Sequence, residues 1–129
     1  LRRVQGVGWE PDLDVTHLDH GSAATQRCER MWRGFAPATV RSNRQTNDTT
    51  CEEFFVLEKA LQLTRGNSSA AALEAAIQSL GSSYTSSMLL DGATSYGSGH
   101  KDAPRLFATF GWKPSCGCIA YTGAPRPLA

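Results

Sequence analysis

Four side chains that are able to bind a metal ion lie close together near the N-terminus. Asp14, His17, Asp19 and His20 fall within seven residues. Carboxylates and imidazoles are common ligands of divalent metals. The two histidines are not four residues apart on a helix, which is the arrangement that metalloproteases use, and no distant ligand is obvious. A polar surface loop therefore explains the cluster, and we predict no metal site.

Serine and histidine together raise the possibility of a hydrolase. Such an enzyme would combine His17 or His100 with a serine. The Gly-x-Ser-x-Gly pattern of a nucleophile elbow is absent, and Gly97–His100 resembles it only superficially. Gly6 and Gly8 lack the third glycine and the helix of a dinucleotide-binding fingerprint. We therefore expect no enzyme activity and no cofactor, and we keep a small secreted hydrolase as an alternative.

The four cysteines fall as a distant pair, Cys28 and Cys51, and a close pair, Cys116 and Cys118. Their spacing is not that of a zinc site, so an exported protein with disulfides is favoured over free thiols in the cytosol. Of the three possible pairings, local pairing of Cys116 with Cys118 is favoured, which leaves Cys28 for Cys51. The close pair could also be redox-active, although redox motifs usually separate the cysteines by two residues. The sequence alone leaves the connectivity open.

The elements that position these residues follow from periodicity and capping. Ser22 is expected to cap a first helix, and Thr49 with Glu52 matches a capping box at the start of a second. Glycines at positions 66 and 81 are expected to end the second and third helices. The predicted helices cover residues 22–35, 49–65 and about 69–80.

Short strands are expected at both ends of the chain. Val4–Trp9 is largely apolar and is stopped by Pro11, and residues 106–112 and 118–121 form a C-terminal strand pair. The tail 123–129 is expected to be loose. We treat residues 1–129 as one segment of mixed α/β class, with a short strand, three helices and the strand pair.

Composition excludes several classes of protein. Hydrophobic residues make up 40% and charged residues 19%, which suits a globular chain. A net charge of +1 leaves no electrostatic footprint for nucleic acid. The longest apolar stretches are far shorter than the roughly 20 residues of a membrane-spanning helix. Because the chain begins at Leu1, we expect a processed protein or a fragment.

Six stretches in order resemble the C-terminal part of type I periplasmic solute-binding proteins of ABC transporters. The resemblance is to the branched-chain amino acid-binding type, and most closely to actinobacterial members. It covers nearly the whole chain, ending in a Cys-x-Cys-Ile-x-Tyr pattern similar to the family's terminus. The stretches are Gly6–Val15, Cys28–Trp32, Thr49–Leu61, Ser69–Gly81, Gly97–Trp112 and Cys116–Pro125.

The resemblance implies a partial type I periplasmic-binding-protein fold and a function without chemistry. The protein would bind a small solute, amino acid-like or otherwise small and polar, and deliver it to a permease. Its partners would be the solute, the ABC-transporter permease and the remainder of its own binding-protein chain. It would lie outside the cell, in the periplasm or anchored through a missing N-terminal lipoprotein signal. A stand-alone secreted binding module with disulfides is the alternative.

Trp9 and Glu10 are the expected ligand-binding residues. In open α/β sheets, ligands bind outside the carboxyl ends of the strands, and Trp9 ends the first predicted strand. Its ring offers an apolar face and one N–H donor, and Glu10 offers a carboxylate to an ammonium group. Gly6 and Gly8 would let the backbone approach a neighbour or a solute closely. Alternatively, Trp9 packs against the loop that follows.

Overall fold

The computed structural model describes residues 4–11, 21–39, 44–97, 99 and 103–128. It is a mixed α/β fold, as the sequence predicts. Three α-helices precede most of a four-stranded antiparallel sheet. The helices are α1 (Ala23–Phe35), α2 (Arg44–Leu63) and α3 (Ala70–Ser79), with short 3-10 helices η2 (Pro37–Thr39) and η3 (Leu90–Gly92). The strands are β1 (Gln5–Gly8), β2 (Leu106–Lys113), β3 (Cys118–Tyr121) and β4 (Arg126–Pro127).

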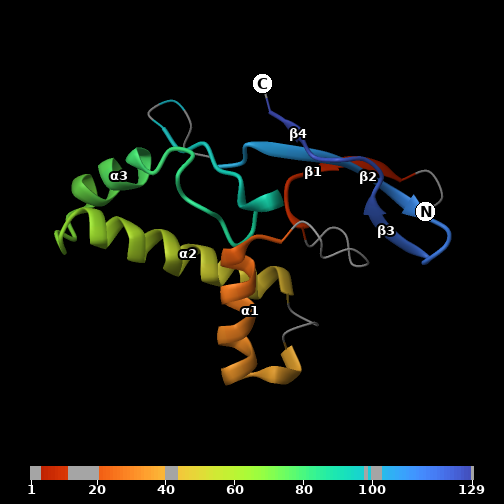
Figure 1. Cartoon of the computed structure of the whole chain (residues 1–129), viewed down its shortest axis with the longest axis horizontal. Coiled ribbons are helices and arrows are strands. Elements are labelled where there is room, and N and C mark those ends of the chain that lie inside the picture. The colour runs from red at the N-terminus through yellow and green to blue at the C-terminus, as the bar shows by residue number, and fades with distance from the viewer. Residues whose placement is uncertain (1–3, 12–20, 40–43, 98, 100–102, 129) are drawn as a thin grey trace.

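The helices and the sheet lie on opposite sides of the connection between α3 and β2. Figure 1 shows α2 and α3 side by side, α1 against the first part of α2, and the sheet on the other side. The α3–β2 connection, which includes η3, runs between the two groups. This connection therefore contributes side chains to any site formed at the junction of helices and sheet.

Helix α1 begins as predicted, because Ser22 caps it. The Ser22 side chain accepts a hydrogen bond from the Thr25 amide, and the Thr25 side chain accepts one from the Ser22 amide. This reciprocal pair satisfies two amide groups that have no partner within the helix. Within α1, Cys28 is fully buried, whereas the large apolar side chain of Phe35 at the end of the helix is 86% exposed.

Helix α2 begins five residues earlier than predicted, at Arg44 rather than at Thr49. The proposed capping box does not form. Instead, the Thr49 hydroxyl donates to the carbonyl oxygen of Gln45 at 2.9 Å, which is compatible with the interior of a helix. Glu52 is used elsewhere, since its carboxylate accepts hydrogen bonds from Ser87. The capping pattern was thus a coincidence of sequence inside a longer helix.

The other predicted helix boundaries agree closely with the structure. Helix α2 ends at Leu63, and Gly66 then takes a φ of +86° while its amide donates to the carbonyl oxygen of Leu61. Only glycine adopts this left-handed conformation without steric cost, which is why it commonly follows a helix. Ser69 caps α3, and its side chain accepts from the Ala72 amide.

All strand pairings of the sheet are antiparallel, whereas the expectation for Trp9 was drawn from the geometry of open α/β sheets. Strand β1 pairs with β2 in opposite directions, with Gln5 opposite Gly111 and Gly8 opposite Ala108. Strands β2 and β3 form the predicted hairpin, which requires antiparallel pairing because its turn is short. Strand β1 therefore finds its partner within the same segment, about a hundred residues along the chain.

Gly6 allows β1 to lie against a large ring of the neighbouring strand. A Cβ added at Gly6 would lie 2.4 Å from the ring of Phe110, its partner in the register. The close approach predicted for this glycine is therefore made with a neighbouring side chain.

The tail carries a short strand where loose chain was predicted. Arg126 and Pro127 form β4 opposite Phe107 and Leu106. The Leu128 amide also donates to the carbonyl oxygen of Arg105 at 2.9 Å. The tail thus forms a strand because its backbone pairs with the first residues of β2. Its amino-acid composition did not predict this strand.

The core lies among the helices and around one disulfide. Cys28, Cys51, Phe55, Leu80 and Tyr84 form a buried cluster. Several large apolar side chains on the helices remain outside it; among them Phe54 is 65% exposed and Leu57 is 41% exposed. Part of the apolar surface of α2 is therefore exposed to solvent in the described part of the chain.

Candidate functional site

A groove of about 890 Å³ lies where the end of β1, helix α2, the α3–β2 connection and the C-terminal tail meet. Its wall combines aromatic, aliphatic and charged side chains, which is typical of small-molecule sites of this size. The lining residues include Trp9, Glu52, Leu89, Tyr96, Arg105 and Leu128.

Trp9, one of the two predicted ligand-binding residues, lines this groove. Its side chain is 46% exposed, and its carbonyl oxygen accepts a hydrogen bond of 2.9 Å from the Leu90 amide. That bond ties the end of β1 to η3. The backbone of Trp9 is therefore held in place while its ring stays accessible.

Glu10, the other predicted residue, is not among the residues that line the groove. Its carboxylate oxygen Oε2 accepts a hydrogen bond of 3.0 Å from the side-chain amide of Gln45. Its carbonyl oxygen accepts another from the Tyr121 hydroxyl. Glu10 thus connects β1 to the start of α2 and to β3, and the structure does not bring its carboxylate together with Trp9 in the groove.

Glu52 supplies the carboxylate of the groove, and sequence reasoning missed it. Its side chain is buried, and Oε2 accepts hydrogen bonds from the Ser87 amide at 2.7 Å and the Ser87 hydroxyl at 2.9 Å. Burial raises the pKa of Glu52 above its usual value, and the hydrogen bonds from Ser87 oppose that rise in part. On sequence, the Glu52 carboxylate was placed in a capping box at the start of the helix, and it was therefore not predicted to line a groove.

Two tyrosines lie near this carboxylate. The rings of Tyr84 and Tyr96 meet edge to face with centroids 6.0 Å apart. Burial, and secondly the negative charge of Glu52, raises the pKa of Tyr96 to about 12 and also raises that of Tyr84. Both phenols therefore remain neutral over the physiological range. Of the two, Tyr96 lines the groove and Tyr84 lies in the core.

The segment that presents these side chains is held by buried hydroxyl groups. The Ser22 hydroxyl donates to the carbonyl oxygen of Ser86, and the Thr25 hydroxyl donates to that of Ser87 at 2.7 Å. The Thr94 hydroxyl donates to the carbonyl oxygen of Tyr84 at 2.7 Å. Because buried backbone carbonyls need such partners, the start of α1 fixes the path of this wall of the groove.

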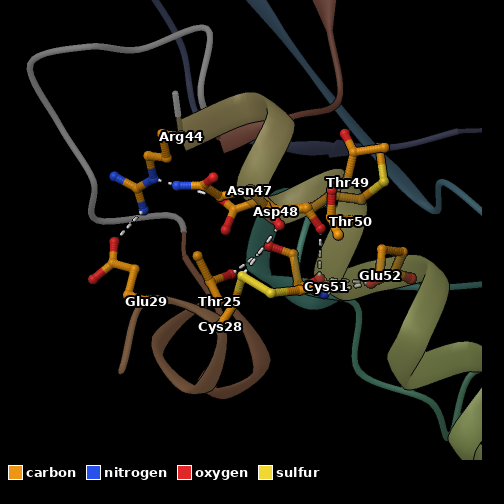
Figure 2. The surroundings of a disulfide bond; sticks show 12 residues. Thr25, Cys28, Glu29, Arg44, Asn47, Asp48, Thr49, Thr50, Cys51 and Glu52 are labelled. Atoms are coloured by element: carbon orange, nitrogen blue, oxygen red, sulfur yellow. Dashed lines mark hydrogen bonds and ion pairs between the residues drawn. A yellow bond between two sulfur atoms is a disulfide. The ribbon is translucent and has the colours of Figure 1, made fainter. Parts of the chain in front are cut away.

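Next to the groove, the Cys28–Cys51 disulfide joins α1 to α2. Its Cα atoms are 5.8 Å apart, and Figure 2 shows the polar residues around it. Arg44 at the start of α2 lies 3.1 Å from Glu29 of α1 and 3.5 Å from the buried Asp48. These ion pairs and the disulfide hold the first turns of α2 against α1, and Glu52 directly follows Cys51.

The second disulfide joins Cys116 to Cys118 at the tip of the β2–β3 hairpin. Both pairings favoured on sequence are therefore present. Disulfides form and persist in oxidising compartments, such as the extracellular space or the periplasm. In the part of the chain that the structure describes, no helix is long and apolar enough to cross a membrane.

Several sequence-predicted chemical groups lie outside the described residues. They include Asp14, His17, Asp19 and His20 of the metal-capable cluster, and His100 of the hydrolase alternative. Among the residues that are described, no three His, Cys, Asp or Glu side chains are placed to hold a metal ion.

The groove is thus lined by Glu52 with its buried carboxylate, by the partly exposed Trp9 and by the exposed, positively charged Arg105. This set can recognise a small polar or zwitterionic molecule with an apolar part. Comparison of the chain with protein-family models, with curated proteins and with solved structures gives no match.

Proposed function

We propose that the chain is the C-terminal part of an extracellular solute-binding protein that delivers a small solute to an ABC-transporter permease. The observation that carries this proposal is the groove, which is lined by Trp9, by Glu52 with its buried carboxylate and by Arg105. The resemblance of six ordered stretches to type I periplasmic binding proteins supports it. The remainder of the binding-protein chain would close over the groove, and a lipoprotein anchor or the periplasm would keep the protein outside the cytosol.

The groove suits an amino acid-like solute. An ammonium group would pair with Glu52. Burial removes water from the Glu52 carboxylate, and a nearby cation would offset the cost of keeping it charged. A carboxylate would pair with Arg105, whose planar guanidinium binds carboxylates bidentately. The apolar part would lie against the ring of Trp9 and the side chains of Leu89 and Leu128. Binding requires no nucleophile, and the protein would act by closing on its solute.

One observation favours the alternative of a stand-alone secreted binding module. The sheet pairs within this segment, since β1, β3 and β4 all pair with β2, and both disulfides also close within it. A stand-alone module would be a monomer with a single cooperative thermal transition. A fragment with Phe54 and Leu57 exposed on α2 would instead aggregate and bind hydrophobic dyes.

The test uses the protein expressed from its own gene, with any coding sequence before Leu1, under oxidising conditions. A thermal-shift screen with the 20 standard L-amino acids and small primary amines identifies a solute, and calorimetry then gives its dissociation constant. Trp9→Ala and Glu52→Gln are each expected to weaken binding at least about tenfold, from lost aromatic contact and lost charge pairing.

Two matched variants control for unrelated effects. Phe54→Ala removes an exposed aromatic ring of α2 outside the groove, and Glu53→Gln neutralises the exposed carboxylate next to Glu52. Both are expected to bind like the parent protein. The proposed solute site is wrong if Trp9→Ala and Glu52→Gln also bind like the parent, and the proposed function is wrong if no compound of the panel binds.

A further inference from the structure

The two disulfides differ sharply in their exposure. Cys28 is fully buried and Cys51 is 4% exposed, and both belong to the core cluster. Cys116 is exposed and Cys118 is half-buried, at the tip of the β2–β3 hairpin. Gly117 lies between them with a φ of +62°, and a Cβ added there would meet no atom within 4 Å. A reactant in solution can therefore approach the second disulfide and not the first.

We propose that the Cys116–Cys118 disulfide is a thiol-exchange site that reacts with low-molecular-weight thiols. An incoming thiolate attacks Sγ of Cys116, the bond between the two protein sulfurs breaks, and Cys118 leaves as a thiolate. A second thiol then attacks the mixed disulfide on Cys116. The products are a small-molecule disulfide and the two protein thiols, so the protein is reduced by two electrons and two external thiols are oxidised. This inference is independent of the proposed function.

The hairpin register indicates which sulfur is attacked and which one leaves. Lys113 and Cys118 are direct partners across the hairpin, and side chains at such positions have neighbouring Cβ atoms on one face. Lys113 carries the only charge among residues 113–118. A nearby ammonium group favours a thiolate over a thiol, and a stabilised thiolate is the better leaving group. Cys116, which is the more exposed of the two, is then the sulfur that the incoming thiolate reaches.

Opening this bond does not remove a contact on which the fold depends. Besides the Lys113–Cys118 pair at the tip, the β2–β3 ladder contains three pairs without a cysteine: Phe110 with Tyr121, Gly111 with Ala120, and Trp112 with Ile119. Strand β2 is also paired with β1 and β4. The hairpin can therefore keep its register while the sulfurs cycle between disulfide and dithiol. This separation of chemistry from the core is what a reversible exchange site requires.

The experiment follows the reaction of the oxidised protein with reduced glutathione at neutral pH. Samples are taken over time, quenched with acid, treated with N-ethylmaleimide and mapped by peptide mass spectrometry. We expect a glutathione adduct on Cys116 with maleimide on Cys118, forming at least about tenfold faster than any modification of Cys28 or Cys51. The Cys116→Ser/Cys118→Ser variant should form no adduct and keep the parent's circular dichroism spectrum.

Lys113→Gln tests the leaving group, and Lys59→Gln, an exposed lysine on α2, is its matched control. We expect Lys113→Gln alone to slow adduct formation several-fold. The proposal is overturned if the core disulfide reacts as fast as the hairpin disulfide, or if none of the four cysteines acquires glutathione. Adducts mainly on Cys118, or equal rates for both lysine variants, would overturn the assignment of attacked and leaving sulfurs.

Discussion

Removing the core disulfide should cost far more stability than removing the hairpin disulfide. Cys28 and Cys51 are 23 positions apart, so their bond closes a loop of 24 residues. In the chain-entropy account, a loop of this length contributes about 3 kcal/mol by restricting the unfolded chain. Cys116 and Cys118 are two positions apart, and the same account gives less than about 2 kcal/mol for their loop.

Packing acts in the same direction. The core sulfurs are buried with Phe55, Leu80 and Tyr84, whereas Cys116 is exposed. The Cys28→Ala/Cys51→Ala variant therefore loses buried contacts as well as the cross-link, and leaves space that the helices fill only in part. We expect a loss of about 3 kcal/mol or more in the free energy of unfolding, and a midpoint of thermal unfolding lowered by about 10 °C.

The assay is urea denaturation followed by circular dichroism, for the parent and for both double cysteine-to-alanine variants under one set of conditions. Similar slopes with urea would show that the midpoints report stability rather than a change in the exposed surface. The reasoning is refuted if the core variant loses less than about 1 kcal/mol, or if the two variants lose the same amount.

Two further predictions concern the sheet and the groove. Gly6→Ala places a Cβ 2.4 Å from the Phe110 ring and should cost about 1–3 kcal/mol in urea denaturation; Gly34→Ala, which meets no atom within 4 Å, should not destabilise, and equal losses would exclude the steric cause. Burial raises the pKa of Glu52 above its usual 4.5, so the folded protein holds the Glu52 proton to a higher pH than the unfolded chain does. This proton binding stabilises the fold fully below pH 4.5, and the stabilisation is lost as the pH rises through the folded pKa. The stability of Glu52→Gln relative to the parent should therefore increase over that range, and a pH-independent difference would contradict the raised pKa.

The sequence predicted those elements that local chemistry specifies. Ser22 and Gly66 act at helix ends through short-range hydrogen bonds and backbone conformation, and they were located correctly. The start of α3 was predicted at about residue 69, and Ser69 caps it. The start of α2 was not, because Thr49 and Glu52 fit a capping pattern equally well inside a helix. Strand β4 was missed because it forms by pairing with β2. The residue types of the tail do not indicate this pairing.

The groove shows the same division between local and distant information. Trp9 was singled out because it directly follows a recognisable strand, and it lines the groove. Glu52 and Arg105 were not, since Glu52 belongs to α2 and Arg105 directly precedes β2, and only the folded chain brings them to the same groove. One feature of the sequence could have indicated that Glu52 is buried. It directly follows Cys51 on a helix, at a position on the side that faces the core.

The positions of Cys51 and Glu52 on α2 link the stability of the helices to the geometry of the groove. Consecutive residues of an α-helix point about 100° apart, so a residue that is fixed on one face determines where its neighbour points. The disulfide directs Cys51 toward α1, and this orientation carries the Glu52 carboxylate to Ser87 and the groove wall. Arg44, paired with Glu29, opposes rotation of the same helix at its first turn. An oxidising environment therefore sets both the stability of the helical core and the placement of the buried charge that the proposed solute would meet.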